Sequence, residues 1–409
     1  MLRAVAVMIV LVEHLGFAFW ANNPGAARVA TIPPIDEPLA FEGFLRPFYT
    51  LITHDVIVGN IGVALFFLIS GFVIPMSLER YATGRFFVAR VFRLYPVWLV
   101  GLLGAVVVFA YAAIRYDQPF PQSPGDWLIN GALIQDWLLA PYIIPLVWTL
   151  LVEIKFYIVC GLMAWAFGVN RALPVLGVVA ALTAFTLAVD GRFEHLAADH
   201  LYLFAAIQIV AFTAKFIAFM FLGLCFYNLF RGNWSPLKFM AVSAALGGMF
   251  VASTYGAPDI DLFKDQVLAS FGIGFAAFAV IFAVRDWIPY SRVLNLVADV
   301  SYPLYTLHWL FGIVLITEFY KLHPVPLLNV AEAIVVIFGL AYLVHRFIED
   351  PLTDLGKRIR FPREALSRLV PNRIGARIPS AEPLPALPSG SAGASAEPPA
   401  EDAGPPGRA

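Results

Sequence analysis

Long apolar runs separated by short polar segments dominate the chain from its first residues to about residue 350. About ten such runs are visible, at 2–20, 57–77, 94–114, 145–167, 172–189, 203–230, 237–252, 266–284, 293–317 and 326–348. A stretch of about 20 apolar residues is long enough to cross a bilayer as a helix. The alternating pattern of a transmembrane barrel strand is absent, and a helix satisfies its own backbone in lipid. The pattern therefore predicts an all-α integral membrane protein, a bundle of about ten transmembrane helices.

The composition supports this interpretation and narrows the class of protein. Of the 409 residues, 60% are hydrophobic and 13% are charged, whereas soluble domains carry about 25% charged residues. The net charge of −1 excludes a nucleic-acid partner, so the expected surroundings are a lipid bilayer. Cys160 and Cys225 both lie inside apolar runs, which indicates neither a disulfide framework nor a metal site. Glu13 and His14 interrupt the first run, which we expect to remain as a span rather than be cleaved as a signal peptide.

The distribution of Lys and Arg sets the expected orientation, because cytoplasmic loops of membrane proteins are enriched in them. If the N-terminus is cytoplasmic, the inner segments hold Arg3, Arg80, Arg85, Arg90, Arg93, Arg171, Arg231, Lys238, Arg285, Arg292, Arg346, Lys357, Arg358, Arg360 and Arg363. The outer segments then hold Arg28, Arg46, Arg115, Arg192, Lys264 and Lys321. We therefore predict that both termini are cytoplasmic.

The organisation along the chain follows from the same pattern. Residues 1–352 are expected to form the transmembrane domain, and residues 353–369 a basic cytoplasmic segment next to the membrane. Residues 370–409 are rich in Pro, Ala and Ser, a composition that cannot bury a core. We expect this last part to be a disordered tail.

Ionisable side chains inside the spans are the first candidates for function, because they are costly in a membrane. Arg3 and His14 share the first run, and the eleven-residue step turns a helix by about 1100°, which puts both on nearly one face. The step rises about 16 Å, so His14 is expected near mid-bilayer, where an imidazole can do acid–base chemistry. A histidine that only packs against a neighbouring helix fits the same pattern.

A second candidate is Glu153, which shares a helical stripe with Thr149 and Tyr157. Its carboxylate could orient or charge-pair a histidine, and the alternative is an internal ion pair with Lys155. Such a pair would be structural rather than catalytic.

A third polar stripe comprises Ser301, Tyr305 and His308, whereas Asp299 is expected on the side opposite His308. The three side chains could line a ligand site. The three side chains could equally serve to form hydrogen bonds between helices.

A basic stretch, RYATGRFFVARVFRLYP, follows the second run. Arg90 and Arg93 stand three residues apart, so both guanidinium groups can point the same way, and Arg forks match phosphate oxygens. This pair could hold a polyanion. A short inner loop is also expected to carry arginines for topological reasons alone.

Several segments resemble, in order, the motifs of the acyltransferase 3 family of integral membrane O-acyltransferases. They are LRAVAVMIVLVEH, GVALFFLISGFVI, RFFVARVFRLYP, VWTLLVEIKFY, VADVSYPLYTLHW and HRFIEDP. The first resembles the family's opening helix, where an Arg and a His are separated by ten residues, and the third resembles its Arg-x-x-Arg stretch. The resemblance covers residues 2–352.

This resemblance implies transfer of an acyl group, most simply acetyl, from cytosolic acyl-CoA to a hydroxyl of a cell-envelope or exported polysaccharide or glycolipid. It implies a multi-pass protein of a bacterial inner (plasma) membrane, with acyl-CoA as a substrate and no tightly bound cofactor. Arg3, Arg90 and Arg93 would hold the coenzyme A phosphates. His14 would deprotonate the acceptor hydroxyl or relay the acyl group, with Glu153 beside it. Ser301, Tyr305 and His308 are weaker candidates to line the substrate or stabilise an oxyanion.

Two other functions are compatible with ionisable residues in spans. A proton-coupled secondary transporter uses such groups as relays, but it often shows two similar halves, and no such symmetry is visible here. A non-catalytic, flippase-like partner of a polysaccharide assembly system is the other alternative.

The orientation can be tested by fusing reporter domains to the loops. We expect residues 80–93 and the C-terminal tail to report a cytoplasmic location, and residues 21–55 an external one, because of the Lys and Arg distribution. An external location of residues 80–93 would contradict an acyl-CoA site there, since coenzyme A is a cytosolic compound.

Overall fold

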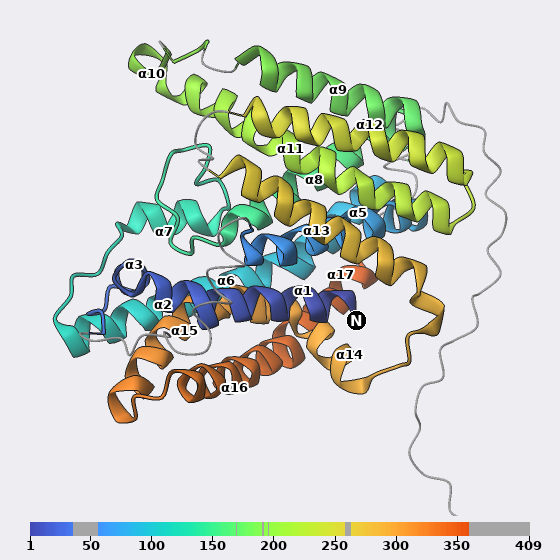
Figure 1. Cartoon of the computed structure of the whole chain (residues 1–409). Helices are drawn as coiled ribbons and strands as arrows, with labels where there is room; N and C mark the ends of the chain where they lie inside the picture. The colour runs from blue at the N-terminus through green and yellow to red at the C-terminus, as the bar shows by residue number, and fades with distance from the viewer. Residues whose placement is uncertain (36–55, 169, 190–191, 195, 258–262, 360–409) are drawn as a thin grey trace, which may run out of the picture. The chain divides into compact units, whose positions relative to one another are not determined.

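The computed structural model describes residues 1–35, 56–168, 170–189, 192–194, 196–257 and 263–359, and within these ranges it contains helices and connecting loops but no strand (Figure 1). The predicted segment 353–369 begins inside a helix, and from residue 360 it lies outside the described residues, as does the tail 370–409.

Long helices account for most of the described chain. They are α1 (Leu2–Leu11), continued by the π-helical turn η1 (Val12–Ala18) and α2 (Phe19–Ala21); α5 (Val58–Arg80); α6 (Thr83–Tyr116); α8 (Val147–Ala166); α9 (Ala172–Val189); α11 (Leu201–Phe230); α12 (Pro236–Tyr255); α13 (Lys264–Ala283); α15 (Ser301–Leu322); and α16 (Pro326–Val344). The shorter ones are α3 (Asn23–Val29), α7 (Pro124–Gly131), α10 (Leu196–Asp199), η2 (Arg285–Trp287), α14 (Arg292–Asp299), η3 (His345–Glu349) and α17 (Asp350–Arg358).

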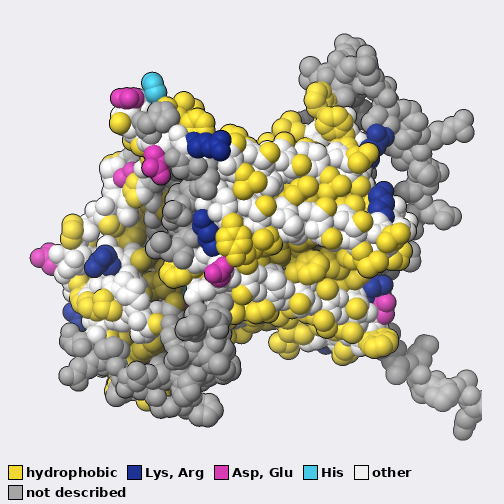
Figure 2. Space-filling view, turned by 45° about the horizontal axis from the view of Figure 1, so that its top comes forward, with side chains coloured by type: hydrophobic (Ala, Val, Ile, Leu, Met, Phe, Trp, Pro, Cys, Tyr) yellow, Lys and Arg dark blue, Asp and Glu magenta, His cyan; other side chains and the backbone are white. Residues whose placement is uncertain are grey.

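Nine of these helical segments in the described ranges are long and apolar enough to cross a membrane, and the bent pair α14–α15 makes up to ten. The predicted bundle of about ten transmembrane helices is therefore confirmed. Large apolar side chains are exposed along the helices, for example Leu103, Val107 and Ile114. In Figure 2, hydrophobic side chains cover broad areas of the long helices, and charged side chains gather mainly toward the ends. Such a surface suits contact with lipid tails.

The predicted span 293–317 is bent rather than continuous. The chain turns by 67° between α14 and α15, at Val300, and the two helices are long and apolar enough for a span only when they are taken together; the pair ends at Leu322. Within it, α14 has no buried residue and carries Arg292 and Asp299, charges that are costly in lipid.

The basic stretch that we read as a loop is largely helical. Only Tyr81 and Ala82 separate α5 from α6, and Arg85, Arg90 and Arg93 lie in the first turns of α6. α6 has 34 residues, a length of about 51 Å, whereas the hydrocarbon layer is about 30 Å thick. Its arginine-bearing start therefore has length enough to extend beyond the apolar layer.

Helix α5 occupies the middle of the bundle. It packs against α1, α8, α11 and α13, while α9 and α12 cover the other side of α11 (Figure 1). Two glycines allow the closest of these contacts: a Cβ on Gly71 would overlap the carbonyl oxygen of Met220, and a Cβ on Gly223 would overlap that of Leu68. Small residues of this kind let membrane helices approach closely.

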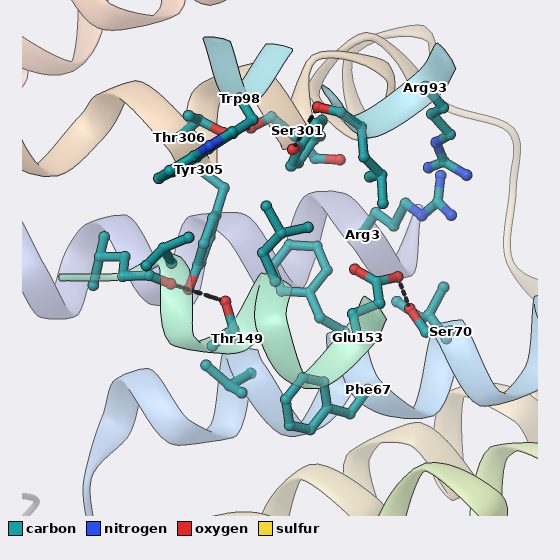
Figure 3. Close-up of a pocket in the computed structure, with 18 of the residues that line it drawn as sticks. Arg3, Phe67, Ser70, Arg93, Trp98, Thr149, Glu153, Ser301, Tyr305 and Thr306 are labelled. Carbon is teal, nitrogen blue, oxygen red and sulfur yellow. Dashed lines mark hydrogen bonds between the residues drawn. The ribbon is translucent and has the colours of Figure 1, made fainter. Parts of the chain in front are cut away.

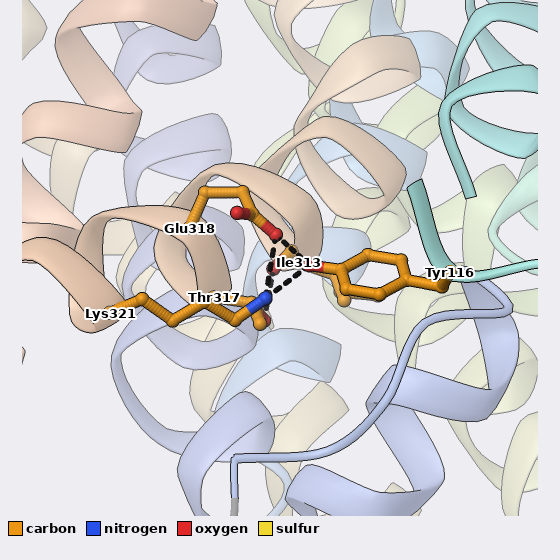
Figure 4. Close-up of polar contacts among 5 residues, drawn as sticks. All are labelled: Tyr116, Ile313, Thr317, Glu318 and Lys321. Carbon is orange, nitrogen blue, oxygen red and sulfur yellow. Dashed lines mark hydrogen bonds and ion pairs between the residues drawn. The ribbon is translucent and has the colours of Figure 1, made fainter. Parts of the chain in front are cut away.

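Polar contacts fix α15 to α6 near both ends. Tyr302 Oη donates to the carbonyl oxygen of Leu94 at 2.9 Å. Near the other ends of the helices, Tyr116 and Lys321 both donate to the Glu318 carboxylate, and Lys321 also contacts the Tyr116 hydroxyl (Figure 4). These contacts hold together two helices that enclose the central cavity described below.

Replacing Gly71 by Ala should destabilise the bundle by about 1–3 kcal/mol, because the added methyl meets backbone that cannot rotate away. Thermal unfolding of the purified protein would measure this. Gly248→Ala in α12 is the matched control, since a Cβ there meets nothing within 4 Å, and a helical Gly→Ala change should be neutral or stabilising. Equal thermal stability of Gly71→Ala and wild type would contradict the close packing.

Candidate active site

Three cavities follow one another along α5. We name them by their linings: the arginine pocket, the central cavity and the aromatic cavity. Ser77 lines the arginine pocket, Phe67 and Ser70 line the central cavity, and Asn60 lines the aromatic cavity. Asn60 and Ser77 are 17 residues apart, about 25 Å along a helix, so the cavities succeed one another across most of an apolar layer.

The central cavity has a volume of about 90 Å³ and lies among α1, α5, α6, α8 and α15 (Figure 3). Arg3, Ser70, Arg93, Glu153 and Tyr305 give it its polar character. Most of the other lining residues are apolar or aromatic: Val63, Phe66, Phe67, Ile69, Leu94, Trp98, Ile144, Leu146, Val147 and Leu150. A few directed polar groups in an apolar wall are typical of a ligand site.

Glu153 is held in place by two hydroxyl donors. Its Oε1 accepts from Ser70 Oγ at 2.6 Å and from Tyr157 Oη at 2.5 Å. Figure 3 shows the guanidinium groups of Arg3 and Arg93 near each other on the same side of the cavity as the carboxylate. A charge inside a membrane protein needs such partners, because burying it alone is very costly.

The expected partners of Glu153 are not the observed ones. The carboxylate bonds neither His14 nor Lys155; Lys155 instead pairs with Asp136 at 2.5 Å. The physical reason is helix geometry: Lys155 is two residues beyond Glu153, a step of about 200° that turns it to another face of α8.

The arginine pocket has a volume of about 320 Å³ and adjoins the central cavity, since Arg3, Arg93, Ser301 and Tyr302 line both. Arg90 and Arg93 both line it, as their spacing predicts. Asp299, His345, Glu349, Asp350 and Lys357 complete its charged wall. This is a charged cavity that leads directly to a smaller, mostly apolar one.

Arg90 is held rigidly although its side chain is long. Its Nη2 donates to Ser77 Oγ at 2.9 Å, and its guanidinium lies 5.1 Å from the ring centre of Tyr157 and 5.3 Å from that of Phe86. Stacking and hydrogen bonding of this kind preorganise an arginine fork for an anion.

His14 contacts His308 from a distant part of the chain. Nδ1 of His14 is 2.8 Å from Nε2 of His308, and Nδ1 of His308 is 2.7 Å from the carbonyl oxygen of Tyr305. A carbonyl only accepts, so His308 Nδ1 carries the hydrogen and, in the neutral pair, His308 Nε2 accepts from His14 Nδ1. His14 Nε2 is then left with a lone pair and can take a proton.

The carboxylate beside His14 is Glu13 rather than the predicted Glu153. Glu13 Oε2 lies 3.2 Å from His14 Nε2, where it would stabilise an imidazolium. His14 is not among the residues that line the central cavity, although Arg3 is. The shared face that we predicted assumed a regular α-helix, whereas the π-helical turn begins at Val12; such turns are frequent at functional sites.

The predicted stripe on α15 is divided between two environments. Ser301 and Tyr305 line the central cavity, whereas His308 is fully buried against His14. The hydroxyl of Ser301 donates to the carbonyl oxygen of Ala298 at 2.7 Å, so its hydrogen is engaged within the helix. The Tyr305 ring is 5.7 Å from that of His308 and its hydroxyl contacts Thr149 at 2.8 Å, so Tyr305 connects the histidine pair to the cavity.

Glu13 and Ser70 belong to the site but were not among the residues predicted for it. Ser70 is a polar residue within an apolar run, and Glu13 directly precedes His14, so both gave a signal. Their partners could not be inferred, because these lie on other helices.

Comparison with known proteins gives a consistent result. Residues 1–346 match the model of a family described as an acyltransferase domain. Over 137 residues the chain is 32% identical to acyltransferase MdmB from Streptomyces mycarofaciens, a match that covers 31% of this chain and 33% of that relative. The match thus spans about a third of that relative's length. No solved structure matches significantly.

Proposed function

Because this chain belongs to the acyltransferase family whose domain model matches residues 1–346, we propose that it transfers an acyl group from cytosolic acyl-CoA to a hydroxyl of a second substrate. The proposed acyl group is acetyl, and the proposed acceptor is a polysaccharide or glycolipid at the inner (plasma) membrane of a bacterium. The observation that carries this proposal is the direct connection of the arginine pocket to the central cavity through Arg3 and Arg93.

Coenzyme A fits the chemistry of the two connected cavities. It carries a pyrophosphate and a ribose phosphate, and Arg3, Arg90, Arg93 and Lys357 line the arginine pocket. Arginine forks bind phosphate oxygens through paired, charge-assisted hydrogen bonds. The uncharged thioester arm would then extend past Arg3 and Tyr302 into the central cavity, whose wall is largely apolar.

The histidine pair supplies a base for the transfer. The acceptor hydroxyl oxygen attacks the thioester carbonyl carbon, and Nε2 of His14 takes the hydroxyl proton. As the new C–O bond replaces the C–S bond, coenzyme A leaves as its thiolate and recovers the proton. Glu13 stabilises the intermediate imidazolium, and His308 is a positioning residue that fixes the tautomer of His14. His14 does not line the central cavity, so this step requires the acceptor hydroxyl and the thioester to meet beside the 20% of the His14 side chain that is exposed, with Tyr305 between the histidine pair and the cavity.

Charge develops on the carbonyl oxygen during this step and needs a donor. The hydroxyl of Tyr305 lines the central cavity, and its ring is 5.7 Å from that of His308. It contacts Thr149 Oγ1 at 2.8 Å and the carbonyl oxygen of Leu146 at 3.4 Å, so it would turn from these partners to donate to the oxyanion.

A single transfer assay with labelled acetyl-CoA tests both the proposed function and the proposed donor site. Membranes that contain the protein should transfer label to a glycan, and Arg90→Ala or Arg93→Ala should raise the KM for acetyl-CoA about tenfold or more. The loss of one phosphate contact of about 1.5–3 kcal/mol accounts for that factor. Lys at either position should restore part of the affinity, because charge returns without the fork.

Arg285→Ala is the matched control for these variants, since Arg285 is exposed and lines none of the three cavities. An unchanged KM in both single variants would leave Arg90 and Arg93 as determinants of topology only. Absence of transfer to any acceptor by the wild type would contradict the proposed function itself.

His14→Gln should lower turnover by about 10²–10⁴-fold, because an amide cannot take the hydroxyl proton. Membrane abundance should change little, since a polar contact between membrane helices averages about 0.6 kcal/mol. His308→Leu should also lower turnover, and His308→Gln should recover part of it because Gln can still accept from His14. His323→Gln, at a histidine paired with Glu332, is the control. Normal turnover in His14→Gln would exclude the imidazole as the base.

A further inference from the structure

We propose that the aromatic cavity is the acceptor site and that it takes a neutral sugar carried on an apolar group. This inference rests on the proposed acyl transfer and names the substrate class for its second half. It is carried by one buried amide without partners, by the pairing of the charges in the cavity, and by the position of the cavity relative to the donor site.

The aromatic cavity lies toward the end of the bundle opposite the arginine pocket. Asn60, near the first residue of α5, lines it, whereas Ser77, near the last, lines the arginine pocket. Its volume is about 740 Å³, against about 320 Å³ for the arginine pocket. Helix α8 forms the partition: Glu153 faces the central cavity, and Trp148 and Lys155 face the aromatic cavity.

Gln135 is the feature that points to a ligand. Its side chain is fully buried and lines this cavity, yet neither its amide nitrogen nor its amide oxygen has a hydrogen-bond partner within the described structure. The buried amide oxygen of Gln208, which lines the same cavity, also lacks a partner within the described structure. Unsatisfied buried amides are rare because they cost stability, and each exception calls for an explanation. An amide donates and accepts, which matches the hydroxyl groups of a sugar.

The charged residues of the cavity favour a neutral ligand. Lys155 and Asp136 form an ion pair of 2.5 Å, so they contribute no net charge. The arginine pocket, by contrast, is lined by Arg3, Arg90, Arg93 and Lys357 against the carboxylates of Asp299, Glu349 and Asp350, so its cations outnumber its anions by one. The two cavities therefore suit ligands of different charge. This difference is expected if one site binds a phosphate-bearing acyl donor and the other binds an uncharged polyol as acceptor.

The rest of the lining is suited to the apolar part of the ligand. Trp148 packs against Phe212 and Phe216, with ring centres 6.2 and 5.3 Å apart, and all three line the cavity. Flat aromatic faces can cover the C–H face of a sugar ring or an attached apolar group. Phe67 lines the central cavity and packs on both Trp148 and Phe216, so it marks where an acceptor hydroxyl would pass toward the thioester.

Gln135→Leu tests the site, because it should change affinity and stability in opposite directions. In nanodiscs, the variant should bind p-nitrophenyl β-D-glucopyranoside about tenfold more weakly than wild type by calorimetry, since the amide contacts are lost. Its thermal unfolding temperature should be equal or higher, because a buried amide without partners becomes an apolar side chain. The KM for acetyl-CoA should not change. Gln118→Leu, at an exposed glutamine outside all three cavities, is the matched control.

Three further ligands distinguish what the cavity recognises. Glucose alone and p-nitrophenol alone should each bind at least tenfold more weakly than the glucoside if both parts are held. A glucosyl-diacylglycerol in the nanodisc should compete with the glucoside if the natural acceptor is a lipid. It should not compete if the natural acceptor is a water-soluble glycoside. Both results agree with a cavity that binds a neutral sugar on an apolar group.

Equal affinity of Gln135→Leu and wild type for the glucoside would overturn the proposal and leave the amide as a hydrated packing defect. So would failure of wild type to bind either sugar-bearing probe. Because binding is measured without acyl-CoA, a protein that binds the glucoside but transfers no acyl group would refute the proposed function and not this site.

Discussion

The close contact between α5 and α11 is the constraint on which the arrangement of the cavities depends. Gly71 and Gly223 have no side chains, so the two backbones touch, and α5 is drawn into the middle of the bundle. From that position one helix lines all three cavities in succession. A separated or laterally displaced α5 would leave the arginine pocket without a defined path to the rest of the site.

Pairing of ionisable groups is the second constraint, because lipid cannot solvate them. Glu153 is satisfied by Ser70 and Tyr157, and Lys155 by Asp136. His14 lies between His308 and Glu13. Each pairing joins the site to a particular helix or loop, so the polar groups that serve chemistry also fix the helices around the cavities.

The distribution of charge gives the proposed reaction a direction. Four cations and three carboxylates line the pocket formed by the start of α6 and the end of α5, while the opposite cavity is lined by one Lys–Asp pair and aromatic rings. A polyanionic donor and a neutral acceptor would thus bind at different ends and meet at the central cavity. The small volume of that cavity suits a short acyl group on a narrow thioester arm.

The sequence by itself determined the transmembrane helices and the residues that share a face within one helix. Hydropathy located about ten spans, and helical spacing placed Arg90 beside Arg93 and Glu153 beside Tyr157, because these relations depend on one helix at a time. The tertiary structure alone decided the partners: His308 is 294 residues from His14, and Lys155 turns to Asp136 rather than Glu153. It also decided the bend at Val300 and the end of α5 at which each cavity lies. Periodicity specifies which way a side chain points from its own helix, but only packing determines which other helix it meets.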